Sequence, residues 1–200
     1  MILRRLPPLR PHGRRWMRLL TALPFLTWGL GSHAQTRIHM YADEPLLWRD
    51  MVAHVEDGVV RLGPDWRGDI VFTLHGGRQG DEVALFQGFS TSALDVLYTV
   101  RDGQLCVGDS HFSDAILYTV DNDQIFQGDS TFPFDVIYSL REEAPTVLAS
   151  GHASGHASGR VPVWGLYRED SRSWSDRVAL FEGKPHAAEL FALLLASGWL

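Results

Sequence analysis

The sequence has a single cysteine, Cys106, among its 200 residues. One cysteine excludes an intramolecular disulfide and any CxxC redox or zinc motif, so the stability of the fold must come from packing. The sequence also lacks an HExxH motif and a glycine-rich phosphate loop, which are signatures of zinc proteases and nucleotide-binding enzymes. Cys106 lies in an apolar, strand-like run. We interpret it as a small buried hydrophobic residue rather than a nucleophile.

Acidic residues are absent from the first 34 residues, which contain six arginines. An apolar stretch from Leu19 to Leu30 follows the arginines and ends at the small-residue site Ser32-His33-Ala34. This order predicts a secretory signal peptide over residues 1–34 that is cleaved after Ala34, with an uncleaved amphipathic anchor as the alternative. The apolar run is short for a membrane span and is interrupted by a proline and a glycine. We therefore expect a bacterial protein that is periplasmic or secreted, without integral membrane insertion after cleavage. The Arg14-Arg15 pair leaves Sec and twin-arginine export both open.

Basic residues are scarce in the remaining chain. Residues 35–200 keep 12 of the 18 Lys and Arg residues and all 24 Asp and Glu residues, so their formal charge is 12 − 24 = −12. An acidic surface repels phosphate backbones, and we therefore expect no nucleic-acid partner.

Between residues 83 and 140 the sequence repeats itself every 20 residues. The repeat is marked by a glycine, Gly88, Gly108 and Gly128, and by a tyrosine, Tyr98, Tyr118 and Tyr138. A period this short is typical of one small supersecondary unit that is copied and stacked. Weaker copies on both sides bring the number of units to six, at residues 38–58, 59–82, 83–103, 104–123, 124–160 and 161–183.

The second half of each unit alternates between two faces, as a β-strand does. In one unit Val96, Tyr98 and Val100 share a face, while Leu97 and Thr99 share the other. Asp-Gly and Asn-Asp pairs after these runs favour tight hairpin turns. A flat meander of about twelve such strands would leave its edges exposed. We therefore predict an all-β fold in which about six two-stranded hairpin repeats form a closed or curled pseudo-symmetric meander over residues 35–184.

Two segments depart from the repeat. The stretch 146–160 contains a duplicated Gly-His-Ala-Ser and is predicted to be a flexible insertion; His152 and His156 make only a weak metal site there, so we predict neither a metal nor a cofactor. Residues 185–200 are predicted to form a C-terminal helix, with Pro185 in its first turn. Because this helix is apolar nearly all round, we expect it to cap an open face or end of the sheet. The alternative is a helix that docks into a partner's groove.

The segments LYTVRDGQLCVG and LYTVDNDQIFQG resemble the units of small bacterial β-hairpin-repeat proteins, including those called β-flower domains. The resemblance covers residues 83–140. It implies a fold type and no mechanism.

A carboxylate recurs immediately before the second strand of most units. These residues are Asp50, Asp69, Asp95, Asp135 and Asp176. On a pseudo-symmetric ring they would form an acidic rim that could bind calcium or sugar hydroxyls. The structural alternative is that each accepts backbone N–H bonds in its own loop. The repeated Gly-Asp-Ser at 108–110 and 128–130 is interpreted as a turn, because a catalytic serine needs one strained elbow rather than copies of it.

These patterns predict an exported, non-enzymatic binding or structural module of the cell envelope or extracellular space, with a protein or glycan partner. No catalytic residue is predicted. The alternative is a glycan-acting hydrolase or a metal-dependent enzyme that uses the acidic rim. Against it, near-equivalent copies of one carboxylate lack the different environments that separate an acid from a base.

Overall fold

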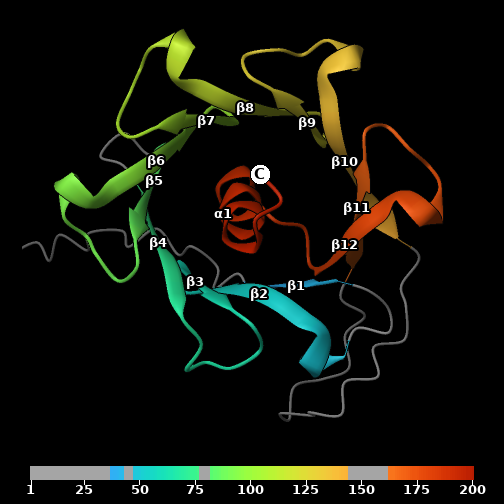
Figure 1. The fold of residues 1–200 in the computed structure, drawn as a ribbon, viewed down its shortest axis with the longest axis horizontal. Coiled ribbons are helices and arrows are strands. Elements are labelled where there is room, and N and C mark those ends of the chain that lie inside the picture. Colours follow the sequence, from blue (N-terminus) through green and yellow to red (C-terminus); the bar gives the residue numbers. More distant parts are fainter. Residues whose placement is uncertain (1–36, 43–46, 77–81, 144–161) are drawn as a thin grey trace, which may run out of the picture. The chain divides into compact units, whose positions relative to one another are not determined.

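The structure is a computed structural model that describes residues 37–42, 47–76, 82–143 and 162–200. Their twelve strands form one antiparallel sheet that closes into a barrel in chain order, since β1 pairs with both β2 and β12 (Figure 1). The strands are β1 (Ile38–Tyr41), β2 (Met51–Glu56), β3 (Val59–Leu62), β4 (Ile70–Gly76), β5 (Glu82–Gln87), β6 (Val96–Arg101), β7 (Gln104–Val107), β8 (Ile116–Asp121), β9 (Gln124–Gln127), β10 (Val136–Glu143), β11 (Val163–Arg168) and β12 (Arg177–Glu182). The predicted closed meander of hairpin repeats is confirmed.

Each unit contributes two strands joined by a wide connection that, in the five units where it is fully described, bends outward from the ring (Figure 1). We call these connections, at residues 42–50, 63–69, 88–95, 108–115, 128–135 and 169–176, the outer loops. Five of them end in a single 3-10 turn: Trp48–Asp50, Ala93–Asp95, Ser113–Ala115, Pro133–Asp135 and Trp174–Asp176. Tight turns connect β2 to β3, β6 to β7 and β8 to β9 at the other end of the barrel. At Asp102-Gly103 both residues have positive φ (48° and 77°), as the predicted hairpin turn requires.

Every unit has a β-bulge near the start of its second strand. In the third unit Phe86 pairs with Val96 and Leu85 pairs with Tyr98, so Leu97 has no partner across the ladder. The same register shift recurs in the other five units. Strict alternation is therefore wrong at this point, because a bulge turns the residue before it to the other face of the sheet. Val96 shares the outer face with Phe86, while Tyr98 and Val100 face the interior.

In five of the six bulges, the carbonyl of the extra residue accepts the N–H of a left-handed residue in the next outer loop. The N–H of Gly108 donates to the carbonyl of Leu97 at 2.8 Å, and Gly128 does the same to Leu117 at 2.7 Å. Both glycines have φ near +60°, where a side chain is strained. In the last unit the corresponding donor is Glu169, which bonds Ile137 at 2.8 Å with φ +53°. Glu169 therefore has a left-handed backbone conformation at a position where four other units have glycine.

The C-terminal helix α1 (Ala187–Ser197) runs through the centre of the ring (Figure 1). His186 is its N-cap, and its backbone N–H donates to the Glu189 carboxylate at 2.9 Å, while Gly198 ends the helix in the left-handed conformation. The sequence suggested that Pro185 lies in the first turn of the helix. It instead precedes the N-cap residue. The helix covers the apolar interior as expected, but from inside the barrel and not at one end.

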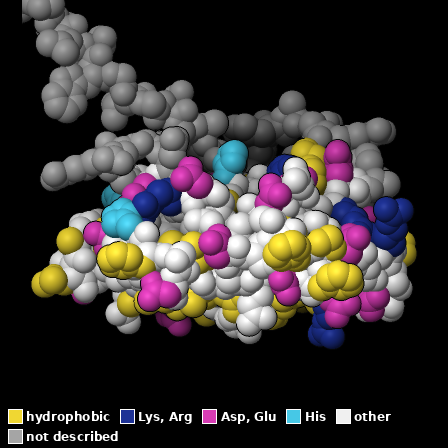
Figure 2. Space-filling view, turned by 90° about the horizontal axis from the view of Figure 1, so that it is seen from above, with side chains coloured by type: hydrophobic (Ala, Val, Ile, Leu, Met, Phe, Trp, Pro, Cys, Tyr) yellow, Lys and Arg dark blue, Asp and Glu magenta, His cyan; other side chains and the backbone are white. Residues whose placement is uncertain are grey.

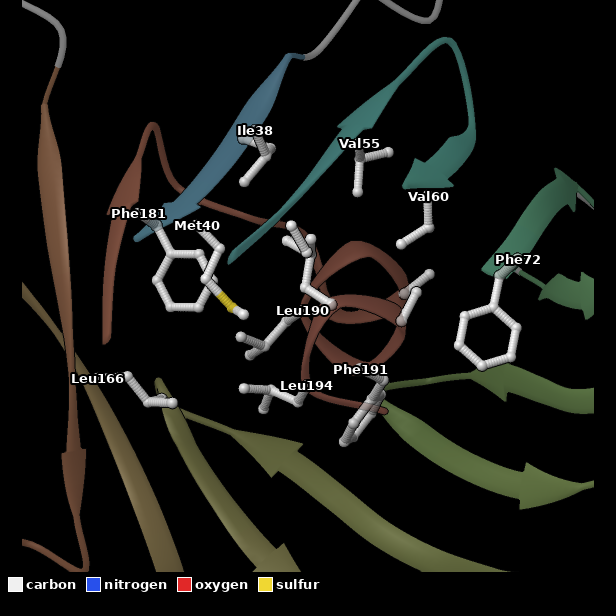
Figure 3. Packing of buried hydrophobic residues seen from close by; sticks show 14 of the residues in the cluster. Ile38, Met40, Val55, Val60, Phe72, Leu166, Phe181, Leu190, Phe191 and Leu194 are labelled. Atoms are coloured by element: carbon white, nitrogen blue, oxygen red, sulfur yellow. The ribbon is translucent and has the colours of Figure 1, made fainter. Parts of the chain in front are cut away.

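The core forms between this helix and the inner faces of the strands. Leu190, Phe191 and Leu194 extend from α1 toward the barrel wall, where they meet side chains such as Phe72 and Phe181 (Figure 3). Phe191, Leu193 and Leu194 are fully buried. A helix buried on all sides explains why its sequence is apolar nearly all round.

The predicted signal peptide and the predicted insertion at 146–160 lie outside the described residues. Among the described residues, no helix is both long and apolar enough to cross a membrane.

Candidate functional site

All six outer loops present at least one large apolar side chain to solvent. The side chains that are more than half exposed are Trp48, Trp66, Phe89, Leu94, Phe112, Phe132, Phe134 and Trp174. Phe134 is 98% exposed and Leu94 is 95% exposed, which is unusual for residues of this size. Figure 2 shows hydrophobic side chains along one side of the molecule with Asp and Glu between them.

The tryptophans among these residues have local partners. The Arg67 guanidinium lies 4.7 Å from the ring centroid of Trp66, and that of Arg177 lies 4.5 Å from Trp174. The three consecutive loops 88–95, 108–115 and 128–135 differ, because their sequence contains five Asp residues and neither Lys nor Arg. We call these three loops the acidic–apolar face. Its apolar side chains are Phe89, Leu94, Phe112, Phe132 and Phe134.

Three carboxylates of the predicted acidic rim are held by a serine of their own loop. The hydroxyl of Ser90 donates to Asp95 at 2.5 Å, Ser130 donates to Asp135 at 2.5 Å, and Ser171 donates to Asp176 at 2.5 Å. Each serine oxygen also accepts a backbone N–H two residues later, as from Phe132 to Ser130 at 3.1 Å. These bonds fix the loop shape, as expected for Asp and Ser in turns.

The remaining carboxylates of the rim have other surroundings. Asp50 lies 3.7 Å from the guanidinium of Arg49, and Asp69 accepts the Leu62 N–H through its backbone carbonyl. In the fourth unit Asp114 lies one residue early and Ala115 takes the place before the strand. The five predicted residues therefore lie on five different loops. The described residues contain no group of three or more His, Cys, Asp or Glu placed to hold a metal ion.

A pocket of about 480 Å³ opens at the barrel end that carries the outer loops. Helix α1 packs most closely against β2, β3, β4 and β7, which leaves space between its C-terminal end and the wall formed by β8 to β11. The lining residues are Tyr118, Gln127, Val136, Ile137, Tyr138, Arg168, Glu169, Trp199 and Leu200. The half-buried rings form the floor, and Gln127, Arg168 and Glu169 form an exposed mouth. We call this the barrel-mouth pocket.

The repeat identifies two residues of this pocket as departures. At the end of the first strand, units three and five have Gln87-Gly88 and Gln127-Gly128, whereas the last unit has Arg168-Glu169. Neither side chain makes an ion pair or hydrogen bond to another described residue. The pocket was not predicted from the sequence, since it combines several strands with the segment after the helix. The replacement of Gln-Gly by Arg-Glu was the signal that could have pointed to it.

A cluster of titratable side chains lies where β1 meets β12. Nδ1 of His39 is 2.9 Å from Oε2 of Glu182, and the Tyr41 hydroxyl donates to the same oxygen at 3.2 Å. The hydrogen bond with His39 holds the pKa of Glu182 below its ordinary value of 4.5, although burial opposes the shift. Burial, together with the Glu182 charge, raises the pKa of Tyr41. These bonds join the first strand to the last and thereby help to close the barrel.

His54 is buried at a position that is threonine in three of the other units. Its Nδ1 lies 2.9 Å from the carbonyl of Gly63, and in the next units Thr73, Thr99 and Thr119 donate to the carbonyls of Gly88, Gly108 and Gly128 at 2.6, 2.6 and 2.7 Å. Burial lowers the pKa of His54 from 6.5. The single cysteine is also buried, and burial raises the pKa of the Cys106 thiol, as expected for a structural residue. His152 and His156 lie outside the described residues.

Comparison with known proteins is informative about the family. The family model described as "6-fold beta flower protein" matches residues 40–153, which is more than half of the chain. No curated protein matches the sequence. A crystal structure of a protein from Arabidopsis thaliana is 18% identical, with 81% of this chain and 89% of that chain covered and a TM-score of 0.38.

Proposed function

The chain belongs to the 6-fold β-flower family, and from that fold we propose that it is an exported, non-enzymatic binding module. The acidic–apolar face is its binding surface. The observation that carries this proposal is the exposure of Phe112, Phe132 and Phe134, which are 75%, 72% and 98% exposed. Large apolar side chains gathered on one surface of a soluble protein are typical of interaction sites.

Charge complementarity indicates the chemistry of the partner. The loops of the acidic–apolar face carry Asp95, Asp109, Asp114, Asp129 and Asp135, and neither Lys nor Arg. A partner that buries the phenylalanines must place basic groups opposite these carboxylates, since like charges across an interface are strongly unfavourable. We therefore propose a polypeptide surface that combines Lys or Arg with apolar side chains. Anionic lipid headgroups would be repelled.

The loop hydrogen bonds support a non-catalytic role. Asp95, Asp135 and Asp176 each accept a serine hydroxyl in the same geometry, so their environments are nearly equal. An acid–base pair needs carboxylates whose environments separate their pKa values. This similarity argues against an acid–base pair among these three carboxylates and in that respect supports a binding module.

The binding surface is tested by replacing Phe112, Phe132 and Phe134 together with serine. Wild-type and variant proteins are cross-linked in the bacterial envelope fraction, and the cross-linked polypeptides are identified by mass spectrometry. We expect one basic polypeptide that is captured by the wild type, lost with the triple variant and weakened by salt. Trp66→Ser is the matched control, because it removes an exposed aromatic residue from outside the acidic–apolar face. Equal capture by wild-type and triple-variant proteins would overturn the proposal.

Export is tested separately. If residues 1–34 are a signal peptide, the protein recovered from the periplasm or medium begins at Gln35. Ala34→Asp should block processing, because the cleavage site requires a small residue there. A retained Met1 on protein from these fractions would contradict the export proposal.

A further inference from the structure

The barrel-mouth pocket has the features of a ligand site that is independent of the acidic–apolar face. We propose that it binds a neutral sugar ring, as a free saccharide or as one residue of a short glycan. The volume of about 480 Å³ lies within the usual range of about 300–1,000 Å³ for small-molecule pockets.

The floor of the pocket suits the flat, apolar faces of a pyranose ring. Tyr118, Tyr138 and Trp199 line the pocket and are half-buried, so part of each side chain is accessible to a ligand there. Packing the C–H groups of a sugar on such faces removes apolar area from water on both partners. Tyr138 is fixed in place, because its hydroxyl donates to the backbone carbonyl of Trp199 at 3.1 Å.

The mouth of the pocket offers the hydrogen bonds that sugar hydroxyls need. Arg168 can only donate, the Glu169 carboxylate can only accept, and Gln127 can do both. A hydroxyl group also donates and accepts, so a polyol can use all three side chains. The charges of Arg168 and Glu169 cancel, and the mouth therefore favours neither an anion nor a cation.

The backbone of Glu169 indicates that this mouth is retained despite a cost to stability. Its φ of +53° belongs to a position where the other units have Gly63, Gly88, Gly108 and Gly128. A non-glycine residue in this region is strained, and such residues concentrate at functional sites. The Glu169 side chain lines the pocket and forms no hydrogen bond or ion pair with another described residue.

The proposal is tested by ligand-observed NMR with cellobiose, maltose, lactose and chitobiose, and with glucuronic acid and glucosamine as charged counterparts. The decisive variant is Arg168→Gln with Glu169→Gly, which restores the Gln-Gly pair of two other units and removes the strained backbone position. It should fold at least as well as the wild type. A loss of binding can then be assigned to the pocket and not to unfolding. Trp199→Leu removes the stacking face while keeping an apolar side chain, and Trp66→Ser is the control outside both the pocket and the acidic–apolar face.

We expect at least one neutral disaccharide to bind the wild type and Trp66→Ser alike. The double variant should bind it at least about tenfold more weakly, as expected when hydrogen bonds to charged groups are lost, and Trp199→Leu should also weaken binding. Three results would overturn the proposal: no binding of any neutral disaccharide, undiminished binding by the double variant, or tighter binding of a charged counterpart.

Discussion

Single residues in this protein can be judged against their own copies in the other units. The left-handed position after the first strand is glycine in four described units and Glu169 in the last. The buried position that is threonine in three units is His54 in the first unit. Each departure therefore comes with an internal reference that shows what the fold prefers at that place.

Glu169→Gly should stabilise the protein by about 0.5–1 kcal/mol, because the strain of a side chain at φ +53° exceeds the extra entropy of glycine in the unfolded chain. In a domain of this size the melting temperature should rise by roughly 1–4 °C. The reciprocal change Gly108→Glu, at φ +61° with open space around the added Cβ, should lower it. Thermal unfolding of both variants checks the prediction. Shifts of the same sign would contradict it.

His54→Thr should remove one component of acid sensitivity. Because burial lowers the folded-state pKa of His54 below 6.5, the unfolded chain takes up this proton more readily. The stability that the neutral imidazole provides is present above pH 6.5 and is lost as the pH falls toward the folded-state pKa. Threonine can bond the Gly63 carbonyl as its copies do and has no titration there. Urea unfolding of both proteins between pH 7.5 and 5 should show a steeper loss for the wild type; parallel curves would refute the assignment.

At the scale of elements, the sequence predicts well what repeats and poorly what breaks the repeat. The spacing of Gly88, Gly108 and Gly128 was sufficient to predict hairpin units and twelve strands. The bulge at Leu97 was not predictable from the alternation of polar and apolar residues. The extra residue moves Val96 to the outer face, but valine is apolar on either face, so the sequence pattern looks the same. The apolar helix was predicted, but its place inside the ring was not. That place depends on the radius of the barrel, which cannot be derived from local sequence patterns. The barrel-mouth pocket was missed for the same reason.

Helix α1 is the largest apolar element of the interior, and the barrel should not fold without it. Phe191 is fully buried, so Phe191→Ala should cost roughly 3–5 kcal/mol. Deleting residues 185–200 should abolish cooperative unfolding. Ser197→Ala, near the end of the helix, should cost far less. Circular dichroism melts distinguish these outcomes. A truncated protein with an undiminished transition would instead favour the partner-docking interpretation of the helix.

At the scale of the whole molecule, the ladder between β1 and β12 closes the barrel, and we call it the seam. The ladder between β1 and β12 pairs His39 with Glu182, and their side chains are also in contact. The other ladders join neighbouring strands of the chain, whereas this ladder joins the first strand to the last. The seam is therefore the place where a local change has the most global effect.

The seam should weaken in acid. Because its hydrogen bond with His39 lowers the folded-state pKa of Glu182 below 4.5, the carboxylate contributes stability above pH 4.5 that is lost as the pH falls through the folded-state value. Glu182→Gln should flatten the stability profile below pH 4.5 and lower the plateau above it. The control is Glu142→Gln, a carboxylate outside the seam. Urea unfolding between pH 6 and 3 tests this, and an unchanged slope for Glu182→Gln would contradict the prediction.

The same seam constrains the order of events during biosynthesis. His39 and Glu182 are 143 positions apart in the chain, and α1 follows the strand that completes the ring. In a nascent chain, the edge of β1 that pairs with β12 stays open until the last unit has been made, and the central helix is added only after that. Such long-range closure is slow, and it exposes an edge and an apolar wall in the meantime. The full fold therefore cannot form before the last unit and α1 have been synthesised.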